Sequence, residues 1–130
     1  MRSHFILYVA DQSRSTEFYR DVLALPPALD LPGMTEFRLG ADAVLGLMPE
    51  AGIARLLGAA IRDPAGARGI PRCELYLLVE DPAMHHRRAL ARGARELGAL
   101  ARRDWGHDVA YCEDPDGHVL AFARDPGRTG

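Results

Sequence analysis

The sequence predicts an α+β protein made of two tandem modules, each with the element order βαβββ. An internal repeat is the first observation behind this prediction, because residues 74–81 repeat the pattern of residues 4–11. A second correspondence follows, since residues 118–122 match residues 43–47. The third observation is size: 130 residues, 48% of them hydrophobic and 26% charged, are typical of one globular domain.

The first module, about residues 3–48, begins with an apolar run that predicts a strand. β-Branched and aromatic residues dominate this run, and Asp11 at its end can cap a helix. Phe18, Val22 and Leu25 then share one helical face, and Pro26 stops the helix. The elements predicted for this module are a helix over residues 13–25 and strands over residues 4–11, 28–31, 35–39 and 43–47.

The second module, about residues 72–124, follows the same order. Asp81 closes its first strand, Pro82 stands at an acceptable first helical position, and Gly93 ends the helix. The run DPDG at residues 114–117 has the residues of a chain reversal and predicts a hairpin. The elements predicted for this module are a helix over residues 82–92 and strands over residues 74–81, 96–102, 108–113 and 118–122.

The two modules are joined by residues 49–71, which are rich in Gly and Pro. This composition predicts a connector or a lid, with one short helix over residues 53–61. Since both modules are too small to be typical separate domains, residues 1–130 are expected to form a single domain.

Charge and hydropathy exclude several kinds of partner. The net charge of −2 comes from 16 basic residues, all arginine, and 18 acidic residues. Binding to nucleic acid needs clustered cations, and the arginines here are spread out, so no nucleic-acid partner is expected. No apolar stretch reaches the roughly 18 residues of a membrane span, and the N-terminus has no secretory pattern. We therefore expect a cytoplasmic protein with no membrane partner.

Cysteine and histidine usage points to structural roles. Cys73 and Cys112 lie in apolar, strand-like runs and are expected to be buried thiols without a disulfide. His85 and His86 are adjacent on the second helix, about 100° apart around its axis, so they cannot aim at one metal ion. Both are expected on the surface.

Three features together resemble the vicinal oxygen chelate superfamily. They are the tandem βαβββ modules, the first helix with Phe18 and Tyr19, and the closing turn DPDGH at residues 114–118. That superfamily includes glyoxalase I, extradiol dioxygenases, fosfomycin-resistance enzymes and bleomycin-resistance proteins. The resemblance covers about residues 4–124 and implies curled mixed sheets that form a cleft, completed in a homodimer. It does not choose among members whose chemistry differs.

In the metal-dependent members, the ligands come from the first and last strands of each module. The resemblance places His4 and Glu74 at the first-strand positions, and Gly46 and Ala121 at the last-strand positions. Glycine and alanine carry no donor atom, whereas a firm transition-metal site needs three or four protein ligands. We therefore expect no metal cofactor and no glyoxalase-type proton abstraction by a last-strand carboxylate.

Strand alternation and the resemblance together indicate which residues line the implied cleft. Trp105 stands just before a predicted strand, where an aromatic ring closes a pocket or covers the rim of the sheet. The cleft itself either accepts a ligand or is filled by its own side chains. The ligand-binding residues predicted for it are His4, Tyr8, Glu74, Tyr76, Trp105 and Tyr111.

The sequence thus predicts a small-molecule-binding protein, or a metal-independent enzyme, of the glyoxalase/bleomycin-resistance type. No catalytic residue is assigned. One alternative is a divergent metal-dependent glyoxalase- or dioxygenase-like enzyme that holds a divalent ion with His4, Glu74 and a further donor such as Glu36 or His107. Another is a partner-binding module with a collapsed cleft.

Overall fold

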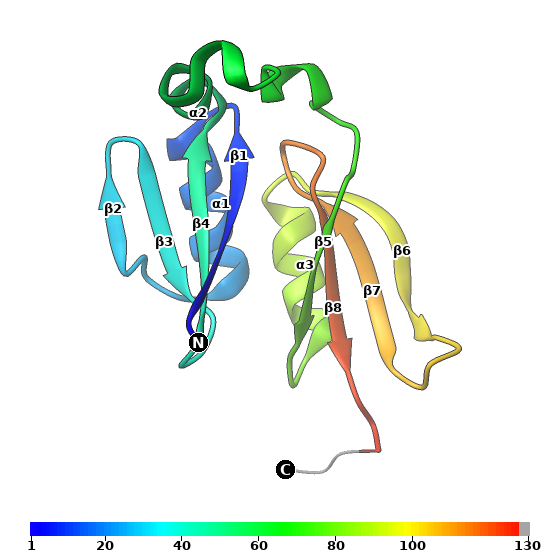
Figure 1. Ribbon diagram of the computed structural model, residues 1–130. Coiled ribbons are helices and arrows are strands. Elements are labelled where there is room, and N and C mark those ends of the chain that lie inside the picture. The colour runs from blue at the N-terminus through cyan, green and yellow to red at the C-terminus, as the bar shows by residue number, and fades with distance from the viewer. Residues whose placement is uncertain (128–130) are drawn as a thin grey trace. The chain divides into compact units, whose positions relative to one another are not determined.

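The computed structural model describes residues 1–127, which divide into two compact units, the first Met1–Arg68 and the second beginning at Gly69. Each unit contains a four-stranded mixed sheet and one long helix in the order βαβββ (Figure 1). The predicted α+β class with tandem modules is therefore confirmed. The curled cleft and the homodimer stay predictions. Among the described residues, no helix is long and apolar enough to cross a membrane.

The first unit has its strands in the order β1-β4-β3-β2, with β1 parallel to β4 and the other pairs antiparallel. Asp11 caps α1 as predicted, because its side chain accepts a hydrogen bond from the Arg14 N–H at 3.1 Å. The elements of the first unit are β1 (Ser3–Val9), α1 (Gln12–Leu23), β2 (Leu29–Leu31), β3 (Met34–Arg38), β4 (Ala43–Pro49), α2 (Glu50–Leu57) and the 3-10 helices η1 (Gly58–Ala60) and η2 (Pro64–Ala67).

Two helix boundaries in the first unit differ from the prediction. Helix α1 ends at Leu23 because Ala24 takes a left-handed conformation with φ of 54° and closes the last turn. The short helix expected over residues 53–61 begins earlier, at Glu50, and ends at Leu57. Pro49 precedes it directly, so β4 continues into α2 without a loop.

The second unit repeats this plan with the strand order β5-β8-β7-β6. Asp81 caps α3 by accepting from the Met84 N–H at 3.1 Å. The turn at residues 114–117 joins β7 and β8 as an antiparallel hairpin, as predicted. The elements are β5 (Glu74–Leu78), α3 (Pro82–Ala91), β6 (Arg95–Arg102), β7 (Asp108–Glu113) and β8 (Val119–Arg124).

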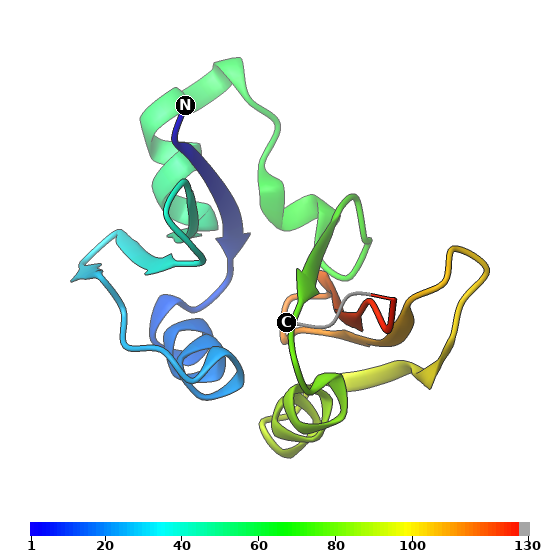
Figure 2. The same ribbon diagram turned by 90° about the horizontal axis from the view of Figure 1, so that it is seen from below.

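In each unit the long helix packs on one face of its own sheet (Figures 1 and 2). On α1, the side chains of Phe18, Tyr19 and Val22 are almost completely buried. A polar contact also joins α1 to the sheet, because the hydroxyls of Thr16 and Thr35 lie 2.9 Å apart. Side chains alternate along a strand, so every second residue faces away from the helix and is available for a site.

The strand pairing shows the sequence repeat in three dimensions. In the first unit Ile6 lies opposite Gly46, and in the second Tyr76 lies opposite Ala121. Gly46 and Ala121 therefore occupy equivalent places in the two sheets, as the sequence alignment required.

Two expectations about burial are wrong. Cys112 is buried, but Cys73 is exposed because it precedes β5 by one residue and lies outside the sheet. His86 is only 7% exposed and places Nε2 at 2.8 Å from a Glu96 carboxylate oxygen. The His85 ring stacks on Phe122 with centroids 5.6 Å apart. The second helix thus uses both histidines to pack against its sheet.

Candidate functional site

Two tyrosines flank a small apolar floor on the second sheet. Tyr76 and Tyr111 both lie opposite Ala121 in the strand pairing. Phe122 contacts α3 through His85, so Ala121, its neighbour in the strand, points to the opposite face. We call this side of the sheet the tyrosine face; its partly buried Tyr76 and Tyr111 pack against the fully buried side chains of Val109, Ala121 and Ala123.

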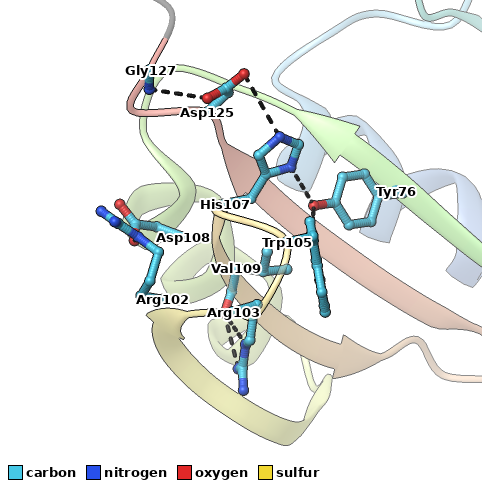
Figure 3. A network of polar contacts seen from close by, with 9 residues as sticks. All are labelled: Tyr76, Arg102, Arg103, Trp105, His107, Asp108, Val109, Asp125 and Gly127. Carbon is cyan, nitrogen blue, oxygen red and sulfur yellow. Dashed lines mark hydrogen bonds and ion pairs between the residues drawn. The ribbon is translucent and has the colours of Figure 1, made fainter.

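A row of polar contacts runs along one side of the tyrosine face (Figure 3). The indole Nε1–H of Trp105 donates a hydrogen bond to the Tyr76 hydroxyl oxygen at 2.9 Å. That hydroxyl lies 2.7 Å from Nδ1 of His107. On the other side of the imidazole, Nε2 lies 3.8 Å from a carboxylate oxygen of Asp125. Four residues from β5, the β6–β7 loop and the end of β8 are therefore linked.

The loop between β6 and β7 explains why Trp105 reaches Tyr76. Gly106 has φ of 91°, a left-handed conformation that favours glycine, and its N–H donates to the Arg103 carbonyl at 2.9 Å. The Arg103 N–H donates to the His107 carbonyl at 2.8 Å, which closes the turn. Trp105 at the tip stays 54% exposed, so its ring is available to a ligand.

Arg103 fixes a positive charge beside the other tyrosine. Its guanidinium carbon lies 5.2 Å from the centre of the Tyr111 ring, within the range of a cation–π contact. The guanidinium also donates to the carbonyls of Ala99 and Val109, at 2.9 and 3.0 Å from Nη2. Gly98 gives it room, because a Cβ there would lie 3.2 Å from Nη2.

The charges around Tyr111 favour its neutral form. Burial raises the pKa of Tyr111, and the nearby Glu74 carboxylate and Tyr76 raise it further, while Arg103 acts in the opposite direction. The Tyr111 hydroxyl therefore keeps its proton to a higher pH than an ordinary tyrosine and can serve as a hydrogen-bond donor.

In the first unit, the equivalent strands hold a different arrangement. Nδ1 of His4 lies 3.3 Å from a carboxylate oxygen of Glu36, and both side chains are partly exposed. Gly46 leaves little free space beside them, because a Cβ there would lie 3.0 Å from the Ile6 side chain and 3.2 Å from the sulfur of Met34. A larger residue at Gly46 would require its neighbours to move.

The residues at the superfamily's metal-ligand positions do not fit a metal centre. Gly46 and Ala121 have no donor atom, and a ligand side chain at position 46 would require Ile6 and Met34 to move. Within residues 1–127, no group of three or more His, Cys, Asp or Glu side chains is placed to hold a metal ion. The donor set therefore supports no step through a metal.

The structure brings together three of the predicted site residues directly. Trp105 and Tyr76 are hydrogen bonded, and Tyr111 is their neighbour across Ala121. Glu74 is exposed two residues before Tyr76 on β5, and its charge acts on Tyr111. Two further predicted residues, His4 and Tyr8, lie on β1 of the first unit. The cleft assignment of all six stays a prediction.

Three residues of this network were not predicted in their observed roles. His107 was considered only as a metal donor, yet it contacts the Tyr76 hydroxyl. Asp125 and Arg103 were not selected at all. Tyr76 and His107 are 31 positions apart, so no local pattern in the sequence signals their contact.

A separate cavity of about 500 Å³ lies in the first unit, between α1 and β2. One of its polar lining residues, Gln12, is committed to structure through both atoms of its amide group. The Gln12 amide nitrogen donates to the Leu31 carbonyl at 2.7 Å and to the Thr35 hydroxyl at 2.9 Å, and its oxygen accepts from the Gly33 N–H at 2.9 Å. Because these contacts hold the β2–β3 hairpin against α1, we place the candidate site on the tyrosine face instead.

Comparison with known proteins agrees with this architecture. Residues 4–123 match the family described as Glyoxalase-like domain. A glyoxalase-related enzyme from Fulvimarina pelagi is similar in fold, with a TM-score of 0.79 and 22% identity over 97% of this chain and 88% of that one. A glyoxalase/bleomycin resistance protein/dioxygenase family enzyme from Burkholderia phytofirmans PsJN has a TM-score of 0.80 and 16% identity, over 95% of this chain and 97% of that one.

A third structure, a glyoxalase/bleomycin resistance protein/dioxygenase from Nocardioides, covers 100% of this chain and 89% of its own, with a TM-score of 0.71 and 20% identity. No curated protein matches the sequence. The family match spans most of the chain, so this protein belongs to the glyoxalase-like domain family. The resemblance to the vicinal oxygen chelate superfamily is therefore confirmed.

Proposed function

We propose that this protein binds a small, flat, largely uncharged molecule on the tyrosine face and that binding needs no metal ion. The observation that carries the proposal is the Trp105–Tyr76–His107 row beside the floor at Ala121. Sites for small molecules combine apolar and aromatic walls with a few fixed polar groups, and this row supplies both.

The chemistry of the surface favours a neutral ligand. Behind its rings lie fully buried, small or apolar side chains, Val109, Ala121 and Ala123, so a ligand would meet the rings of the tyrosine face and of Trp105. Opposite charges lie at its margin, since Glu74 and Arg103 both act on Tyr111. They partly cancel, so neither an anion nor a cation gains strongly, whereas an aromatic ring gains contact with the exposed Trp105.

The protein is proposed to act as a homodimer, as the family resemblance implies, and to work in the cytoplasm. A metal-dependent reaction is the less supported function, because two of the four family ligand positions are Gly46 and Ala121. Catalysis without a metal is compatible with the same surface, but binding comes first and is the property to test.

Calorimetric titration of chelator-treated protein with 2-naphthol tests the proposal. The wild-type protein should bind saturably, and Trp105→Ala should weaken binding about fivefold or more through the lost aromatic contact. Phe5→Ala is the matched control, because it removes a ring that is 61% exposed, compared with 54% for Trp105, from the first unit. Absence of binding by the wild-type protein, or equal weakening by both variants, would contradict the proposal.

A further inference from the structure

We propose that Tyr76 selects ligands that donate a hydrogen bond, because Trp105 and His107 leave its hydroxyl oxygen able only to accept. The inference rests on the proposed function and adds a ligand class: a flat aromatic molecule with a hydroxyl or N–H group at its edge. It follows from the direction of each hydrogen bond in the row beside the tyrosine face.

The direction of the hydrogen bonds depends on Asp125, which stands at one end of the row. A carboxylate accepts hydrogen bonds and donates none, and Asp125 faces Nε2 of His107 at 3.8 Å. That distance is too long for a hydrogen bond, but of the two neutral tautomers the negative charge favours the one with its proton on Nε2. We assign this tautomer from the partners of the ring. Nδ1 is then left with a lone pair.

The Tyr76 hydroxyl has one proton, and His107 takes it. Nδ1 accepts, so the Tyr76 O–H donates across the 2.7 Å contact. An indole N–H can only donate, so Trp105 gives its hydrogen bond to the Tyr76 oxygen at 2.9 Å. The hydroxyl proton is bonded to His107, and one lone pair of the oxygen accepts from Trp105. The oxygen can therefore only accept a hydrogen bond from a ligand, through its remaining lone pair.

A ligand acceptor placed against this oxygen would bring lone pairs together, whereas a ligand donor would complete the set of hydrogen bonds. One net hydrogen bond corresponds to a difference of about three- to tenfold in affinity. Tyr76 is only partly buried, so its edge is accessible from the tyrosine face. Discrimination of this size is expected between donor and acceptor ligands of equal shape.

The hydrogen bond between Tyr76 and His107 predicts how a change at His107 alters the choice between donor and acceptor ligands. Replacing His107 by a residue without an acceptor releases the Tyr76 proton, and the hydroxyl can then donate to a ligand. A ligand with only an acceptor should therefore gain relative to a donor ligand. A purely structural role for His107 would lower both affinities together and leave their ratio unchanged.

The experiment compares 2-naphthol, which donates, with 2-methoxynaphthalene, which only accepts. Affinities are read from the indole N–H signal of Trp105 in ¹⁵N nuclear magnetic resonance spectra, since the chain has one tryptophan. In the wild-type protein, 2-naphthol should bind about three- to tenfold more tightly. The ratio of the 2-naphthol affinity to the 2-methoxynaphthalene affinity should fall to about one or below in Tyr76→Phe and in His107→Phe. The bulk of the methyl group cancels when the ratios of variants are compared.

Asp108→Asn is the matched control. Asp108 is next to His107 in the chain but pairs with Arg102, and Figure 3 shows it on the side away from Tyr76. This variant should keep the wild-type ratio. If Tyr76→Phe fails to give a dispersed spectrum, His107→Phe carries the test alone.

The possible failures are distinguishable. Equal affinity of the two probes for the wild-type protein, or an unchanged ratio in the folded variants, would overturn the role of Tyr76 while leaving the proposed binding site intact. If neither probe binds the wild-type protein, the proposed function and this inference are both wrong.

Discussion

Replacing Gly117 by alanine should destabilise the protein more than any other single glycine-to-alanine change with the same backbone conformation. Gly117 ends the turn between β7 and β8 and has φ of 90°. A Cβ there would lie 2.7 Å from the Cα of Gly69. This backbone atom cannot rotate away, and the Gly69 N–H donates to the Asp116 carbonyl at 3.2 Å, which holds the two segments together.

The magnitude is worked from two contributions. A left-handed conformation costs a residue with a side chain about 1–2 kcal/mol. Overpacking adds about 1–3 kcal/mol where the neighbour is rigid. Gly93→Ala isolates the first contribution, because Gly93 has φ of 96° and a Cβ there would meet no atom within 4 Å. We expect a loss of about 1–2 kcal/mol for Gly93→Ala and about 2–5 kcal/mol for Gly117→Ala.

Urea unfolding followed by circular dichroism measures both free energies. The change that alanine makes in the unfolded chain is common to the two variants and cancels in their difference. A difference of at least about 1 kcal/mol is expected. Equal losses would show that the Gly69 segment yields without cost, and would refute the reasoning from the close approach.

Further predictions concern a thiol, a turn and assembly. Burial, followed by the charges of Asp114 and Glu113, raises the pKa of Cys112 to about 12 from 9.0, so at pH 8 a thiol reagent should label only Cys73 until the protein unfolds. In the unfolded chain the Cys112 thiol loses its proton at a lower pH than in the folded protein. The free energy of unfolding should therefore fall as pH rises from 9.0 to about 12, by at most about 1.4 kcal/mol per pH unit. In Cys112→Ala this fall should be less steep. Asp114→Ala should cost about 2 kcal/mol in urea unfolding, because its carboxylate accepts from the N–H groups of Asp116 and His118. Sedimentation should give a species of twice the 14.2 kDa chain mass; a monomer would contradict the expected homodimer.

The strands and helices were predictable because each is signalled locally. The caps at Asp11 and Asp81 stand where the apolar runs end, and both form. The repeat aligned Gly46 with Ala121, and the strand register places them equivalently. Such features depend on residues close in sequence or on a direct comparison of the two halves.

Burial on the second helix was misjudged although a signal was present. Pro82, His86 and Ala89 recur at helical spacing, and all three are buried. The sequence interpretation considered His85 and His86 only as possible metal ligands and did not use the position of His86 on the apolar face. Glu96 then satisfies one ring nitrogen of this otherwise buried group.

The polar row of the candidate site was beyond sequence reasoning for a physical reason. Tyr76 was selected from strand alternation and Trp105 from its place just before a strand, but their contact depends on the turn at Gly106. Arg103 lies over Tyr111 beside Gly98, where the pairing of β6 with β7 shifts register. Neither the turn geometry nor the register shift has a distinct signature in a single sequence.

Metal-free binding on the tyrosine face is tested most directly by mapping 2-naphthol onto chelator-treated protein with ¹⁵N nuclear magnetic resonance, before and after addition of zinc. We predict saturable shifts of the Trp105 indole and of the Tyr111 and Ala121 amides, with the same affinity in both conditions. No shift without metal, followed by saturable binding once zinc is present, would contradict the account and favour a metalloenzyme.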